Sequence, residues 1–454
     1  MTTRALAEFV AGLRPEDLPK EVIAQAARVV LDAVGCAVAA WTEDAEKSRI
    51  ARGIAAMYPA SPGAGVIGAR GIVAQPAFAA LANGILVNAA DNDDTHKVAL
   101  LHVGSCVVPA ALALAEARGL GGPRLLAAVV AGYEVAVRVG MAVMPTHYRF
   151  WHSTATNGTF GGAASAANAH GLDADGTQRA LGLAGTQAAG LNTFFESGDM
   201  TKSLHPGKAA MNGVLSAQLA ALGMTSPPGI LEHSKGYLAA YSLEPRAAAL
   251  TAGLGSAWEI LNNGFKFFPS ILASHSPIQA TLAIVAKHRP DPARIARITN
   301  ETYNTVLSHF SSKEAGTVMA ARVSVPYCIA AAAVDGALTQ AQFAPGRIHD
   351  PLIRRVLDRT EVIADPQLNT LYPANFPARV TITMEDGQSF QETVMLPKGD
   401  PGNPLSDAEL EDKFRGNVEP LFGAAQAIRL RDAILRLAEG GPVGALSAAM
   451  VPGG

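Results

Sequence analysis

Charged residues are scarce in this chain. Asp, Glu, Lys and Arg make up only 17% of its 454 residues, whereas 49% are hydrophobic, so the chain can bury a large core. The net charge is -3 and no long run of Lys or Arg occurs, which argues against a surface that binds nucleic acid. The composition therefore predicts a globular protein that does not bind nucleic acid.

Cysteine is rarer still, and long uninterrupted apolar runs are missing. Cys36, Cys106 and Cys328 lie far apart, which disfavours a disulfide framework and a cysteine-ligated metal centre. The most hydrophobic stretch, residues 124–144, contains Glu134 and Arg138, and residues 1–18 carry several charges without an apolar core. We therefore expect a cytoplasmic protein with neither a signal peptide nor a membrane-spanning helix.

Familiar cofactor motifs are missing as well. No phosphate-binding loop, His-Glu-x-x-His or Gly-x-Ser-x-Gly occurs. Residues 63–68 (Gly-Ala-Gly-Val-Ile-Gly) match the dinucleotide spacing but follow Pro-Ala-Ser-Pro, so we expect a glycine-rich loop there. Residues 91–96 (Asp-Asn-Asp-Asp-Thr-His) begin like a calcium loop, but His96 stands where glycine is required. The sequence thus predicts neither a metal nor a cofactor.

What the chain has in abundance is helical periodicity. Apolar residues recur every three or four positions over residues 20–41, and similar patterns follow at 76–90, 107–117, 124–143, 161–170, 175–188 and 208–222. The many alanines and glycines, such as those at 161–164, let helices approach closely. These patterns predict a multilayer helical core with no strands in the first two-thirds of the chain.

The pattern changes after about residue 268. Residues 378–384 and 389–396 alternate apolar and polar side chains around Asp386-Gly387, which predicts a β-hairpin. Helices are expected at 325–338 and 351–357, and Ser406 with Glu409 forms a capping-box pattern that opens a further helix. We predict a mainly α protein with a helical domain formed by residues 1–267 and 402–454 and an inserted α/β domain at 268–401.

Polar residues stand out against this apolar background. Residues 91–96 and 149–154, with His102, Lys202, His205 and His275, place acids, bases and hydroxyl groups near expected helix ends. If the helix that begins at residue 76 continues through its polar end, Asp91 and Thr95 stand on one face at i and i+4. Lys202 and His205 precede the helix start expected at residues 206–208. Capping or solvation can explain each group singly, but together they favour one anion-binding site.

These residues, taken in order, resemble the MmgE/PrpD family, which includes 2-methylcitrate dehydratases, cis-aconitate decarboxylases and iminodisuccinate epimerases. The resemblance covers nearly the whole chain. It implies that the inserted α/β domain is a lid, that the site lies between the two domains and that the protein is a homodimer. The matching segments are residues 91–96, 102–105, 132–135, 152–161, 202–210, 266–269, 275, 321–327, 403–406 and 413–414.

The resemblance also supplies the candidate site residues. This chain departs from the family in reading Ala90-Asp91-Asn92 for Leu-Asp-Phe and His102-Val103 for His-Pro, and both changes touch the substrate pocket. The predicted catalytic residues are Lys202, His152, His102, His275, Tyr327 and Asp91, and the predicted substrate-binding residues are Thr95, His205 and Lys266.

Proton removal next to a carboxylate builds negative charge, so such a site needs a positioned base and fixed cations or donors. Lys202 or His152 can serve as the base, since the pKa of either can shift toward neutrality. His102, His275 or Tyr327 can protonate a leaving hydroxyl. The sequence thus predicts a cofactor-independent lyase for a small anionic di- or tricarboxylate.

Dehydration of a 2-methylcitrate-like acid is the first expectation. An iminodisuccinate-type epimerase (an isomerase) and a cis-aconitate decarboxylase follow. A non-catalytic ligand-binding protein is the alternative of a different class, and it would exchange no α-proton of a bound substrate.

Overall fold

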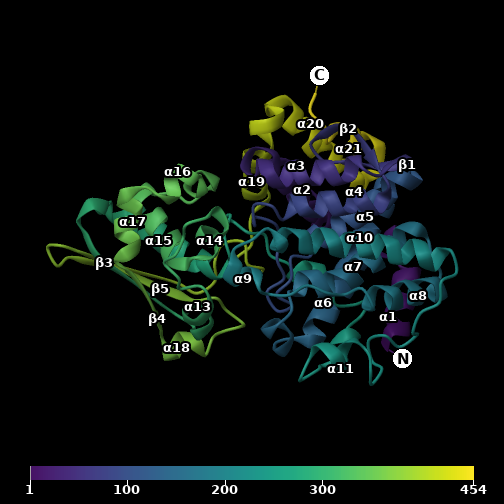
Figure 1. Cartoon of the computed structure of the whole chain (residues 1–454), viewed down its shortest axis with the longest axis horizontal. Coiled ribbons are helices and arrows are strands. Elements are labelled where there is room, and N and C mark those ends of the chain that lie inside the picture. Colours follow the sequence, from purple (N-terminus) through teal and green to yellow (C-terminus); the bar gives the residue numbers. More distant parts are fainter. Residues whose placement is uncertain (1, 454) are drawn as a thin grey trace.

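In the computed structural model, which describes residues 2–453, helices dominate and β-structure is confined to small sheets (Figure 1). The expectation of a mainly α protein is therefore confirmed. Two separate hydrophobic cores are present. We call residues 2–267 and 402–453 the helical part and residues 268–401 the α/β part, because each set contributes to one of these cores.

The helical part is built around α7, which packs against α6 and α10. Small residues permit this close packing: a Cβ on Gly213 would lie 2.3 Å from the backbone of Gly162, and one on Gly207 would lie 2.4 Å from the carbonyl oxygen of Leu81. The helices before residue 268 are α1 (Thr2–Gly12), α2 (Lys20–Glu43), α3 (Ala45–Ala56), α4 (Pro76–Val87), α5 (Gly104–Arg118), α6 (Gly122–Val143), α7 (Ser153–His170), α8 (Ala174–Gly185), α9 (Phe194–Ser197), α10 (Thr201–Ala221) and α11 (Tyr237–Tyr241).

Both ends of the chain contribute to the core of the helical part. The C-terminal helices α19 (Asp407–Phe422), α20 (Ala424–Leu435) and α21 (Val443–Ala449) return to it, and α19 packs against α2 (Figure 1). An ion pair between Lys413 and buried Asp32 fixes this packing, with Lys413 Nζ 2.6 Å from Oδ1 of Asp32. The predicted capping box at Ser406 and Glu409 starts α19 as expected.

The α/β part contains a four-stranded sheet in the order β4-β3-β5-β6. Strand β3 runs parallel to β4 and antiparallel to β5, and the predicted β5–β6 hairpin turns where Gly387 adopts a φ of +85°. Its elements are α12 (His275–His288), β3 (Ile295–Thr302), α13 (Asn304–His309), α14 (Val318–Val323), α15 (Val325–Asp335), α16 (Pro345–Ile348), α17 (Pro351–Asp358), β4 (Thr360–Ala364), α18 (Pro366–Asn369), β5 (Ala378–Met384) and β6 (Ser389–Val394).

Residues 59–74 differ from the sequence expectation. They form an antiparallel pair, β1 (Pro59–Val66) and β2 (Ala69–Ala74), instead of a plain glycine-rich loop. Side chains from distant helices accept hydrogen bonds from the backbone of this strand pair and its turn. The Asn83 side chain accepts from the N–H of Ile67, and the Glu116 carboxylate accepts from the N–H of Gly65. Such long-range partners leave no periodic signal in the local sequence.

Helices α2 and α6 are long and apolar enough to cross a bilayer by length and composition alone. However, 78% and 94% of their most apolar windows are buried inside the structure. Each therefore occupies the position of a core helix.

Candidate active site

A cavity of about 410 Å³ lies where the helical part meets the α/β part, with walls from both. The structure brings most of the predicted site residues to this one cavity. From the helical part it is lined by Asp91, Thr95, His102, His152, Lys202 and Lys266. From the α/β part the lining includes Ile271, Tyr303, Thr305, Phe310, Tyr372 and Phe376.

Asp91 lies in a turn, not on a helix face. Helix α4 ends at Val87, and Asp91 has a φ of +54°, in the left-handed region that aspartate tolerates better than most residues. Thr95 exchanges two backbone hydrogen bonds of 2.9 Å with Gly264, which brings Lys266 beside the turn. The expected i and i+4 placement of Asp91 and Thr95 on one helix is therefore wrong, because the chain leaves the helix before reaching them.

Two buried lysines share one oxygen of the Asp91 carboxylate. Lys202 Nζ lies 2.7 Å and Lys266 Nζ 2.5 Å from Asp91 Oδ1. Burial opposes ionisation of Asp91, but the charges of Lys202, Lys266 and His102 outweigh it and hold the pKa of Asp91 well below its usual range. Burial lowers the pKa of Lys266, although the Asp91 charge acts in the opposite direction. The cavity wall therefore carries an ionised carboxylate clamped by two cations.

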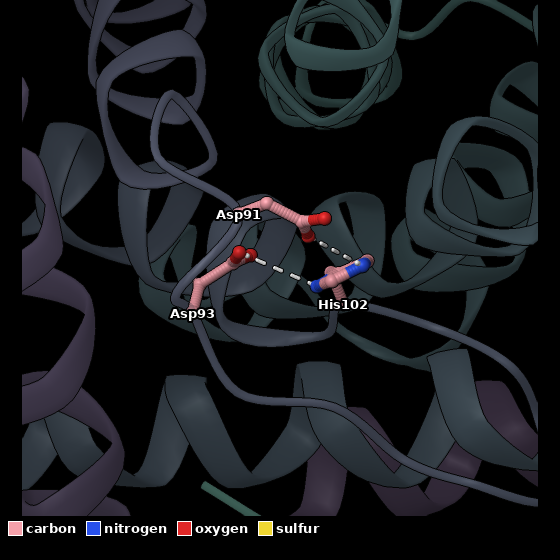
Figure 2. A group of neighbouring side chains, drawn as sticks. All are labelled: Asp91, Asp93 and His102. Atoms are coloured by element: carbon pink, nitrogen blue, oxygen red, sulfur yellow. Dashed lines mark ion pairs between the residues drawn. The ribbon is translucent and has the colours of Figure 1, made fainter. Parts of the chain in front are cut away.

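His102 lies between two carboxylates (Figure 2). Its Nδ1 is 3.3 Å from Asp93 Oδ1 and its Nε2 is 3.6 Å from Asp91 Oδ1. Each ring nitrogen of His102 therefore faces a carboxylate oxygen, which fixes the orientation of the ring at the cavity wall. Burial alone would raise the pKa of Asp93. The charge of His102 and a hydrogen bond from His102 have the larger effect, so the pKa of Asp93 lies below its usual value.

The Asp91, Asp93 and His102 group also has the ligand types and spacing of a cation site. However, Asp91 Oδ1 already contacts both lysine ammonium groups. A divalent cation at that oxygen would meet two like charges at close range, so the group fits the two ammonium groups better than a metal ion.

His152 pairs with His205 behind the cavity wall. His152 directly precedes α7, and its Nδ1 lies 2.9 Å from Nδ1 of His205, which is not itself part of the lining. Burial, together with the charges of His205, Lys202 and His102, holds the pKa of His152 well below its ordinary value. Burial and nearby lysines lower the pKa of His205 to about 4. Both rings are therefore neutral near pH 7, so His152 has an unprotonated ring that can act as a base, and its lowered pKa makes it a weak one.

The structure does not bring His275 or Tyr327 to the cavity wall. His275 is fully buried at the start of α12, its ring packs against Phe268, and burial lowers its pKa to about 3. Tyr327 lies in the core of the α/β part, and its hydroxyl donates to the carbonyl oxygen of Gln342. The predicted proton-donor roles of both residues lose their geometric support, because their polar atoms are held inside the protein.

Other lining residues escaped the sequence reasoning. Tyr148, Asn192, Tyr303 and Tyr372 line the cavity, and Arg149 from the polar run at 149–154 lies there too. The polar run at 149–154 contains Arg149, and Tyr148 directly precedes that run. Tyr303 and Tyr372 carried no signal, since each is a single aromatic residue in the α/β part.

Helix α10 begins earlier than the sequence suggested. It starts at Thr201, so Lys202 and His205 stand in its first turns and not in a loop before it. Pro206 is the sixth residue of this helix and has no N–H to donate to the carbonyl oxygen of Lys202, one turn earlier. The early start places Lys202 on a rigid element that faces the cavity.

Comparison with known proteins gives consistent matches over almost the whole chain. The sequence model of the MmgE/PrpD N-terminal domain matches residues 4–249, and that of the MmgE/PrpD C-terminal domain matches residues 268–439. A cis-aconitate decarboxylase-like protein of Aspergillus oryzae is 28% identical over 96% of this chain and 94% of its own length. The cis-aconitate decarboxylases of Aspergillus terreus and Homo sapiens are 28% and 29% identical, over 96% and 92% of this chain and 93% and 88% of their own lengths.

Proposed function

The chain belongs to the MmgE/PrpD family, and we propose that it is a lyase that acts on a small di- or tricarboxylate through a carbanion next to a carboxylate. The observation that carries the proposal is the convergence of Lys202, Lys266, His102 and His152 on one cavity. Cations at this wall attract a polyanion, and two imidazoles in different surroundings, His102 between carboxylates and neutral His152 beside His205, can supply opposite proton-transfer roles.

The two lysines differ in how many of their N–H donors are already bonded to Asp91. Lys266 Nζ donates to both Oδ1 and the carbonyl oxygen of Asp91, at 2.5 and 3.0 Å. Among residues 2–453, Lys202 Nζ pairs with Asp91 and makes no further hydrogen bond, so more of its three donors stay free for a substrate carboxylate. We therefore assign Lys202 to the substrate and Lys266 chiefly to Asp91.

Among the reactions known in the family, decarboxylation of a cis-aconitate-like tricarboxylate is now the first proposal. The relatives at 28–29% identity are two cis-aconitate decarboxylases and a cis-aconitate decarboxylase-like protein, which favours this reaction over the dehydration expected from the sequence. When the C–C bond to the departing CO₂ breaks, its electron pair stays on carbon and must take up a proton. His102, held between two carboxylates, can supply that proton.

Dehydration of a 2-methylcitrate-like acid is the second candidate. It requires a base at the α-proton and an acid at the leaving hydroxyl. His152 is held neutral near pH 7, and the ring nitrogens of His102 lie 3.3 and 3.6 Å from two carboxylates, which supports that pair of roles in one cavity.

Proton NMR of the purified enzyme in D₂O, with cis-aconitate, 2-methylcitrate and an amino dicarboxylate, tests these proposals. Decarboxylation shortens the carbon skeleton and adds deuterium, dehydration of 2-methylcitrate creates a carbon–carbon double bond without changing the number of carbons, and epimerisation washes deuterium into an unchanged skeleton. Lys202→Ala protein, purified identically, controls for contaminating enzymes. Binding of these acids without any exchange or product would replace the lyase proposal with a ligand-binding role.

A further inference from the structure

The hydroxyl group of Tyr303 has no hydrogen-bond partner in the described part of the chain. Its side chain is only 2% exposed and lines the same cavity as Lys202 and His152. Its hydroxyl oxygen is buried and has no hydrogen-bond partner among residues 2–453. A buried hydroxyl left without a partner costs about 1 to 3 kcal/mol, so an unused one at a cavity wall calls for an explanation.

The ring of Tyr303 is held firmly in place. It follows β3 directly and stacks on Tyr372 with centroids 4.3 Å apart and planes 9° apart. Phe376 contacts it edge to face at 5.8 Å and 86°. Because both neighbours also line the cavity, the aromatic cluster fixes the position of the hydroxyl before any ligand arrives.

The hydroxyl can act only as a neutral donor or acceptor. Burial, with a smaller effect from Tyr372, raises the pKa of Tyr303 well above its ordinary value. Tyr327 provides the contrast in the same part of the molecule, since its hydroxyl is already bonded to Gln342. Of these two tyrosines, only Tyr303 has a donor left for a ligand.

We infer that Tyr303 binds the substrate, and that its phenol donates a hydrogen bond to a substrate carboxylate oxygen. This inference rests on the proposed function and narrows the substrate class. The cations at Asp91 come from the helical part, whereas Tyr303 comes from the α/β part, so the two hold the ligand from different walls. A molecule with one carboxylate cannot serve both walls at once, which selects di- and tricarboxylates over monocarboxylates.

Tyr303→Phe tests the inference, because it removes only the hydroxyl and keeps the ring stack. Tyr58→Phe is the matched control: Tyr58 also stacks on an aromatic ring, that of Phe78, but lies on the surface outside the cavity. The measurements are the affinity for propane-1,2,3-tricarboxylate by calorimetry, the KM for whichever acid is turned over, and the Tm of each protein.

We expect Tyr303→Phe to weaken tricarboxylate binding and raise KM by about 10- to 100-fold, the effect of losing a hydrogen bond to a charged group. Its Tm should not fall, because the change removes an unsatisfied buried hydroxyl. Affinity and KM within twofold of wild type would overturn the inference while leaving the lyase proposal intact, as would a fall in Tm with unchanged binding. A wild-type protein that neither binds nor turns over any polycarboxylate would overturn both.

Discussion

Lys202→Ala is the most informative single change, because Lys202 connects the Asp91 carboxylate to the open cavity. Its Nζ lies 2.7 Å from Asp91 Oδ1, and its side chain is 7% exposed. We expect kcat/KM to fall at least about 100-fold, which corresponds to about 2.7 kcal/mol of transition-state stabilisation. This is the usual scale for losing one electrostatic donor or one general base.

The same change should cost little stability. Removing one partner of a buried ion pair typically costs about 3 to 5 kcal/mol when it strands the other charge. Asp91 is not stranded here, since Lys266 stays 2.5 Å from its Oδ1 and His102 stays 3.6 Å away. Loss of Lys202 also relieves repulsion between the two ammonium groups. We therefore expect a change near 1 kcal/mol, or about 2 °C in Tm.

The assay compares Lys202→Ala with two matched lysine variants. Lys208 lies on the same helix but outside the cavity, so Lys208→Ala should keep wild-type kinetics. Lys266→Ala should lower Tm more than Lys202→Ala, because it removes contacts to both the side chain and the backbone of Asp91.

Kinetics in D₂O separate the two possible roles of Lys202. Loss of a base abolishes α-proton exchange with little change in binding, whereas loss of a carboxylate anchor chiefly raises KM. Near-wild-type turnover in folded Lys202→Ala protein would refute the assignment of Lys202 to the active site. It would also weaken every other assignment that rests on a contact with Asp91 and a position at the cavity wall.

Three further outcomes are expected. Dialysis against EDTA should leave turnover unchanged, because two ammonium groups already occupy the Asp91 oxygen, and activity restored by Mg²⁺, Fe²⁺ or Zn²⁺ would contradict this. Since burial and nearby cations hold the pKa of His152 well below 6.5, the neutral base persists as pH falls through 6.5, and the acid limb of kcat/KM should lie below about pH 6. A limb at pH 7 or higher would place the base elsewhere. Tyr327→Phe should lower stability by about 1 kcal/mol through its lost bond to Gln342, with KM within about twofold of wild type.

Features set by near neighbours in the sequence could be predicted. The β5–β6 hairpin depends on two alternating segments and a glycine at positive φ, and the start of α19 depends on Ser406 and Glu409 three residues apart. The helix over residues 122–143 likewise follows from its continuous apolar pattern. Each of these elements is specified by contacts within a few residues.

Features set by distant partners could not be predicted from pattern. The polar end of α4 looked helical, but Asp91 turns away to meet Lys266, which is 175 residues later. Tyr303 reached the cavity through the path of β3 and its stack on Tyr372, and neither is visible in the surrounding sequence. Most of the site residues predicted with the family resemblance lie at the cavity, but the resemblance also named Tyr327, whose side chain the fold turns into the core.

The turn that carries Asp91 shows why this site needs the whole chain. A residue in the left-handed region persists only where its surroundings fix it. Here, buried cations from separate segments each donate to backbone carbonyl oxygens of the turn, so its conformation depends on both ends of the helical part and on the α/β part. The contacts are Lys47 Nζ and Arg322 Nη1 to Ala89 at 2.9 and 3.0 Å, Lys266 Nζ to Asp91 at 3.0 Å and Lys413 Nζ to Asn92 at 2.6 Å.

The charge balance of this turn follows from the same contacts. Three of these cations are also paired with carboxylates, Lys47 with Asp44, Lys266 with Asp91 and Lys413 with Asp32, so much of their positive potential is balanced within the turn and its surroundings. Arg322 reaches Ala89 from α14 of the α/β part, so a movement of that part would change both the shape and the potential of the cavity. Substrate affinity and docking of the α/β part are therefore expected to be coupled through the backbone at Ala89.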